Sequence, residues 1–213
     1  MGARLDRLLL AAVVAAVANA APATAATFEL HQSGQLLRLS GELKRNDARS
    51  FRELMERDGG RVHTIYLDSP GGSLADGLRI GELIRARNLA TRVPAKAECA
   101  SACVFILAGG RVREVEQGGK VGVHMASALS SDEYVARLKK VLLDRELEID
   151  DRIRVIIAIS EQMAAKAAGA QATYLTRMGI SLRLLQPNFE TNHFDIYWLS
   201  PQELADYNLV NAR

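Results

Sequence analysis

The sequence has few cysteines, few aromatic residues and no long apolar run, and each shortage argues against a class of protein. Two cysteines among 213 residues leave too few ligands for a zinc site. Aromatic residues make up 5% of the chain, and no basic tract with interleaved aromatics points to a nucleic-acid partner. The apolar run at residues 8–17 is well short of the roughly 20 residues that span a bilayer.

Residues 1–26 differ in composition from the rest of the chain. Arg4 and Arg7 precede the apolar run, and small-x-small sites follow it up to Ala25. This order is typical of a secretory signal peptide, so we expect a periplasmic or secreted protein with no stable membrane span after processing. An uncleaved membrane anchor is the alternative. Residues 27–213 have the size of a single domain, and a chain that is 48% hydrophobic can bury a core.

Apolar segments of strand length alternate with segments of helical periodicity. Residues 28–43 predict two short strands around the turn at Ser33-Gly34, and a helix with Phe51 on its apolar face follows. Residues 64–67 and 90–93 predict further strands, separated by a helix. Repeated strand–helix crossovers imply an α/β fold with a largely parallel sheet, in which ligands bind beyond the carboxyl ends of the strands.

The longest helical tract follows Ser131, a favourable N-cap residue. Seven apolar residues form a stripe along it: Val135, Leu138, Leu142, Ile149, Ile153, Ile156 and Ile157. Such a stripe is usually core and sometimes a subunit contact. Glu146 interrupts the stripe, so the tract could be two helices instead of one. Beyond it, residues 186–195 are mainly polar and predict a loop.

Ser101 is the first candidate for a reactive residue. It lies among small residues and directly before the apolar run 104–107, which predicts a short buried helix. At the N-terminus of such a helix, unpaired N–H groups and the helix dipole favour a developing negative charge. The simpler interpretation is that Ser101 only caps the helix.

Two further segments favour catalysis over capping. The strand at 64–67 runs into a helix through Pro70-Gly71-Gly72, where N–H groups without a neighbouring Cβ can approach a ligand. His124 ends the short apolar strand 121–123, and imidazole is the usual base for a serine hydroxyl. The other three histidines, His31, His63 and His193, are predicted to lie on the surface.

The two cysteines, Cys99 and Cys103, flank Ser101. Export to an oxidising compartment permits a disulfide between them. The bond requires Cβ atoms within about 4 Å, which a regular helix does not readily provide. Two small side chains packed in the core are the alternative.

In this order the segments resemble the Clp protease proteolytic subunit family, within the ClpP/crotonase group. The similarity rests on residues 65–72 (IYLDSPGG), 100–109 (ASACVFILAG) and 123–124 (VH), and on 199–210 (LSPQELADYNLV) near the end. It spans about residues 36–210. The Cys-x-Ser-x-Cys setting and the predicted export resemble a branch of small periplasmic ClpP-like proteins. The fold implied is a ClpP/crotonase-like repeated strand–helix core with a largely parallel sheet and a long helix.

The resemblance implies a serine peptidase acting on a peptide or protein, with no metal or organic cofactor. It assigns the nucleophile to Ser101, the base to His124 and the oxyanion donors to the N–H groups of Gly72 and Ala102. The long helix helps to join subunits in the Clp family, so a homo-oligomer is expected.

The third member of the triad is less well placed. We expect Asp195, the nearest acid, to orient His124, although alignment on Leu199-Ser200 puts Ile196, one residue further on, at the family's acid position. An acid there would hold the imidazole in the correct tautomer, and Thr191 or Asn192 could orient it more weakly.

Three alternatives to a Ser-His-Asp peptidase stay open. A non-catalytic interaction protein could keep the fold without the orienting acid. An acyl-CoA enzyme of the crotonase group shares the oxyanion chemistry, although predicted export and the Ser-His pair argue against it. A serine–lysine dyad could use Lys96 or Lys120, which as lysines are more commonly solvated.

Overall fold

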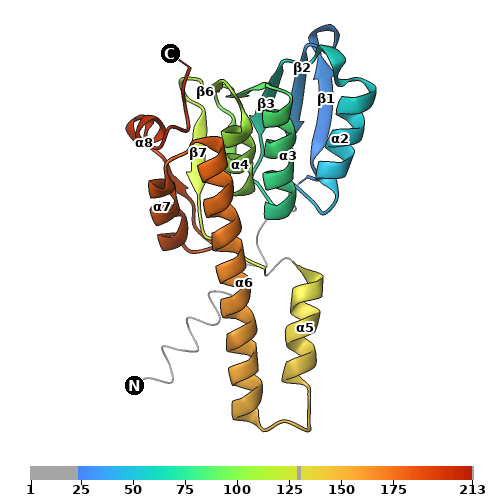
Figure 1. Cartoon of the computed structure of the whole chain (residues 1–213), viewed down its shortest axis with the longest axis vertical. Coiled ribbons are helices and arrows are strands. Elements are labelled where there is room, and N and C mark those ends of the chain that lie inside the picture. Colours follow the sequence, from blue (N-terminus) through green and yellow to red (C-terminus); the bar gives the residue numbers. More distant parts are fainter. Residues whose placement is uncertain (1–23, 129–130, 213) are drawn as a thin grey trace.

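The computed structural model describes residues 24–128 and 131–212, so the predicted signal peptide lies almost entirely outside the described residues. The chain is an α/β protein with two mixed sheets and a long helix (Figure 1). Among the described helices, none combines the length and the apolar character needed to cross a bilayer.

The larger sheet has five strands in the order β1-β2-β3-β4-β6. Its strands are β1 (Thr27–His31), β2 (Leu36–Ser40), β3 (Thr64–Asp68), β4 (Ala90–Val93) and β6 (Arg113–Val115). The first two form an antiparallel hairpin through the short 3-10 helix η1 (Gln32–Gly34), and every other pair is parallel. The largely parallel sheet predicted from the strand–helix alternation is therefore confirmed.

Three helices pack beside this sheet: α2 (Asp47–Arg57), α3 (Leu74–Ala86) and α4 (Ala102–Gly109). All eight residues of α4 are buried, which explains why its sequence has no polar face. Glycines bring α3 and α4 into contact, because a Cβ on Gly81 would lie 2.6 Å from the carbonyl oxygen of Phe105. This close packing sets the N-terminus of α4 beside that of α3. A short 3-10 helix, η2 (Gly59–Arg61), links α2 to β3.

Arg85 of α3 holds the opposite end of α4. Its guanidinium donates hydrogen bonds of 2.8–3.0 Å to the carbonyl oxygens of Ala108, Gly109 and Gly110. A cation there satisfies the last carbonyls and complements the negative end of the helix dipole. Both ends of this short buried helix are thereby fixed in the core.

The smaller sheet joins β5 (Glu98–Ala100), β7 (Lys120–Val123) and β8 (Tyr197–Trp198). Ser69, directly after β3, links it to the larger sheet. The Ser69 N–H donates to the carbonyl of Glu98 at 2.7 Å, and the Ala100 N–H donates to the carbonyl of Ser69 at 3.0 Å. The loop after β3 therefore lies directly against the turn after β5.

The helical tract after residue 130 consists of two helices, α5 (Asp132–Leu142) and α6 (Ile149–Met178). They form a hairpin that projects from the body of the protein, and the buried residues of α6 lie in its C-terminal part, which packs against α3 and α4 (Figure 1). Ser131 caps α5 as predicted, since its hydroxyl accepts from the Tyr134 N–H. The apolar stripe is largely exposed and not part of the core, with Ile153 47% and Ile157 50% exposed.

The C-terminal segment contains a 3-10 helix, η3 (Leu182–Leu184), and two short helices, α7 (Leu185–Glu190) and α8 (Pro201–Asp206). The prediction of a loop over residues 186–195 is wrong for its first half, which forms α7. Buried Asn188 anchors this helix, because its amide donates to the Gln171 side chain of α6 at 3.0 Å. A polar segment can therefore be helical here through one buried polar contact.

Candidate active site

Ser101 lies in a sharp turn between β5 and α4. Its backbone angles are φ 55° and ψ −123°, a region that residues with a Cβ rarely occupy. Such conformations persist where the surroundings impose them, and they occur often at active sites. The Ser101 N–H donates to the carbonyl of Gly122 at 2.9 Å, which holds one side of the turn. In α/β-hydrolases a strained strand-to-helix turn exposes the nucleophilic serine.

The hydroxyl of Ser101 does not cap α4. Ser101 is the N-cap residue by position, but its side chain accepts no hydrogen bond from the helix. Within residues 24–128 and 131–212, no side-chain hydrogen bond to this hydroxyl is present, and the residue is half-buried. The simple capping interpretation is therefore wrong.

A disulfide between Cys99 and Cys103 spans the Ser101 turn. Cys99 lies on β5 and Cys103 on the first turn of α4, and both are completely buried. The turn shortens the distance between their Cα atoms to 5.2 Å, which lies in the usual range for a disulfide. The bond joins the two elements that impose the backbone of Ser101.

The loop after β3 packs directly on this turn through Gly71. A Cβ at Gly71 would lie 2.7 Å from the Ser101 Cβ and 2.8 Å from the Ala102 nitrogen. Gly71 and Gly72 have φ values of +96° and +122°, which side chains rarely allow. Gly71 is therefore needed for this contact, while a Cβ at Gly72 would lie 2.2 Å from the carbonyl oxygen of Leu43.

The predicted oxyanion donors are the N–H groups of Ala102, which lies in this contact, and of Gly72, which follows Gly71 in the chain. In the part of the chain that the structure describes, neither donates a hydrogen bond. Ala102 is the first residue of α4, so its N–H lies at the positive end of the helix dipole. An oxyanion site requires two such unbonded donors, fixed and aimed at one developing negative charge.

His124 directly follows β7, the strand parallel to β5. Ala100 of β5 pairs with Gly122 of β7, so Ser101 and His124 both lie just beyond the carboxyl ends of these two neighbouring strands. No hydrogen bond between the Ser101 hydroxyl and His124 is present among the described residues; in many enzymes such bonds tighten only with substrate. Burial lowers the pKa of His124, and the nearby His193 lowers it further. The lowered pKa favours the neutral imidazole that a general base requires.

His193 is not the surface residue that the sequence predicted. Its ring lies 5.2 Å from that of His124, centroid to centroid, and the two ring planes are inclined by 31°. Burial lowers the pKa of His193 as well. No periodicity or motif around His193 indicates this contact, because it arises from the pairing of two distant segments.

Asp195 is not brought to His124. Its carboxylate is exposed and accepts a hydrogen bond from the Asn192 amide at 2.9 Å, within its own turn. The Thr191 hydroxyl donates to the carbonyl of Pro187, so neither alternative orienting side chain bonds the imidazole in the described structure. The structure thus leaves the predicted acid away from the predicted base.

The two lysines considered for a dyad lie in other surroundings. Lys120 pairs with Glu98 at 3.1 Å and lies over the Trp198 ring, while Lys96 is exposed.

Within the described residues, no group of three or more histidine, cysteine or acidic side chains could hold a metal ion. Comparison of the sequence with known protein families and with curated proteins finds no match.

Proposed function

We propose that the chain is an exported serine peptidase of the ClpP-like type, with Ser101 as nucleophile and His124 as general base. The observation that carries the proposal is the Ser101 turn, where a strained backbone presents an unbonded hydroxyl at the start of a buried helix. The motif resemblance supports the same assignment. The buried disulfide supports export, because such bonds persist in oxidising compartments.

The proposed reaction uses only groups of this chain and water. The Ser101 oxygen attacks the peptide carbonyl while His124 takes its proton, and the N–H groups of Gly72 and Ala102 stabilise the oxyanion. His124 then returns the proton to the leaving amine, and water hydrolyses the acyl-enzyme. Each oxyanion donor contributes about 2.7–4 kcal/mol of transition-state stabilisation where one has been removed from another protease.

The test is the rate at which a fluorophosphonate probe modifies the folded protein. His124→Ala is expected to slow modification by about 100- to 10,000-fold, because general-base assistance to the hydroxyl is lost. His63→Ala is the matched control, since His63 is exposed and, in the described structure, its ring bonds the neighbouring Thr64 hydroxyl alone. Equal rates in the two variants would contradict the role of His124.

A non-catalytic interaction protein is the second candidate, and the position of Asp195 favours it. Without a carboxylate at the imidazole, the imidazolium formed during catalysis lacks its usual stabilisation. Complete absence of probe modification in the folded wild type would support this candidate over the peptidase.

We also propose that the exposed face of the helical hairpin binds a second copy of this chain. Ile149, Ile153 and Ile157 recur every four residues and are about half exposed, so they form one apolar face on α6. The Clp-family resemblance supports a self-association role for this helix. Exposed apolar faces of this kind are typical of interaction sites.

Light scattering after size-exclusion chromatography tests this self-association. The wild type is expected to elute as an oligomer, and the double variant Ile153→Glu with Ile157→Glu as a monomer. Val112→Glu changes an equally exposed apolar residue outside the hairpin and should leave the mass unchanged. A monomeric wild type throughout the micromolar range would contradict the proposal.

A further inference from the structure

We infer that His193 is the positioning residue for His124, in the place that an acid occupies in other serine peptidases. The inference rests on the proposed function of Ser101 and His124. Four observations support it: a ring contact, a main-chain link, two buried ring nitrogens without a partner, and the hydrogen bond of Asp195 within its own turn.

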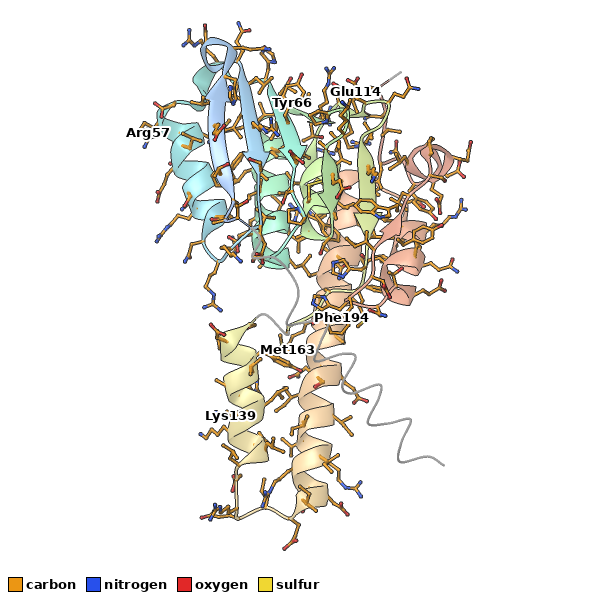
Figure 2. All side chains as sticks on the ribbon, turned by 180° about the vertical axis from the view of Figure 1, so that it is seen from behind. Arg57, Tyr66, Glu114, Lys139, Met163 and Phe194 are labelled. Atoms are coloured by element: carbon orange, nitrogen blue, oxygen red, sulfur yellow. A yellow bond between two sulfur atoms is a disulfide. The ribbon has the colours of Figure 1, made fainter. Side chains whose placement is uncertain are left out.

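The imidazole of His124 is packed against a row of aromatic rings. His193 lies on it at 5.2 Å, and the Phe194 ring meets His193 edge to face at 5.4 Å. Phe194 itself is half exposed and lies at the lower edge of the body in Figure 2. The contact restricts the rotation of the His124 ring. A general base requires this restriction, because one ring nitrogen must stay directed at the group that it deprotonates.

A main-chain link fixes the segment that carries His193. The N–H of Met125, next to His124, donates to the carbonyl of Thr191 at 2.9 Å. The carbonyl of His193 acts on the His124 ring and raises its pKa, although burial and the His193 ring together lower it. The segment that carries His193 is therefore held against the residue that follows His124.

Both histidines have a buried Nδ1 atom without a hydrogen-bond partner in the described structure. An unsatisfied buried polar atom is costly and is often found where a site must rearrange or bind. No other titratable group contributes to the His124 pKa.

The acid that could compete for this role is engaged elsewhere. The Asn192 side chain donates to the Asp195 carboxylate and accepts from the Phe194 N–H at 2.7 Å, which closes the turn that carries Asp195. His193 therefore contacts the proposed base, while Asp195 is exposed two residues further along.

The experiment compares His193→Phe, His193→Ala and Asp195→Ala, with His63→Ala as the control. Two quantities are measured on each folded variant: the rate of fluorophosphonate modification between pH 5 and 8, and the NMR titration of the His124 ring. The His124 signal is assigned by its loss in His124→Gln. Thermal melting identifies variants that do not fold.

His193→Phe keeps an aromatic ring but removes the second titrating group, so the His124 titration should move to higher pH while most of the rate is kept. His193→Ala should lose about 10- to 100-fold in rate, because the base is no longer oriented. Asp195→Ala should change neither quantity. The inference is overturned if Asp195→Ala loses as much rate as His193→Ala, or if neither His193 variant alters the His124 titration.

Failure of the proposed function would be recognised separately. If the wild type is not modified by the probe, the peptidase proposal fails, while the His124 titration still tests the contact with His193. A shift in His193→Phe then supports positioning of the ring, and an unchanged titration overturns it.

Discussion

Ser101→Gly is expected to stabilise the folded protein and, at the same time, to abolish its reaction with a fluorophosphonate. The Ser101 backbone at φ 55° and ψ −123° strains a residue with a Cβ, at a cost of about 1–3 kcal/mol. Glycine adopts positive φ freely, but it loses about 0.5–1 kcal/mol more chain entropy on folding. The free energy of unfolding, measured in urea with the disulfide intact, should therefore rise by about 1 kcal/mol.

Ser101→Ala separates the two effects. It removes the hydroxyl but keeps the Cβ, so modification by the probe should disappear while the free energy of unfolding stays close to that of the wild type. Removing the nucleophile of a known serine protease lowers kcat on the order of 10⁶-fold. Persistent modification of Ser101→Ala would show that Ser101 is not the reactive residue. A Ser101→Gly variant less stable than Ser101→Ala would show that the turn is not strained.

The second large effect is expected from Gly71→Ala. The new Cβ would lie 2.6 Å from the carbonyl oxygen of Ala100 and 2.8 Å from the Ala102 nitrogen. These are backbone atoms, held by the sheets and by the disulfide, so they cannot move aside cheaply. With the added strain at φ +96°, we expect a loss of about 2–5 kcal/mol in the free energy of unfolding. Any fraction that still folds should react slowly, because the loop is displaced from Ser101.

Gly60→Ala is the control for this substitution. Gly60 has no atom within 4 Å of the new Cβ and no positive φ, so its replacement should change the free energy of unfolding by less than about 1 kcal/mol. If both variants unfold at the same urea concentration, the Gly71 loop and the Ser101 turn are not in close contact.

The sequence predicts well those features that depend on local pattern. The apolar run 104–107 is a buried helix because no polar side chain lies within it. The strand–helix alternation gives a largely parallel sheet, and Ser131 begins a helix because its hydroxyl reaches an unpaired N–H group. These outcomes follow from periodicity and from unsatisfied backbone groups.

Features that depend on tertiary pairing are not predicted. His193 reaches His124 because the main chain at Met125 pairs with Thr191, more than 60 residues further along the chain. The exposed face of α6 is not predicted either, since an amphipathic stripe is equally compatible with a core. The sequence also gives no reason for the Asp195 carboxylate to remain in its own turn.

The most direct test of the proposed reaction is to locate the modified residue by tandem mass spectrometry, after treating the folded, disulfide-bonded protein with a fluorophosphonate. Trypsin releases residues 97–111 as one peptide, in which Ser101 carries the only hydroxyl side chain. We predict a single adduct in this peptide, absent when the protein is first unfolded. An adduct on any other residue of the folded protein, or none at all, would contradict the assignment of Ser101 as nucleophile.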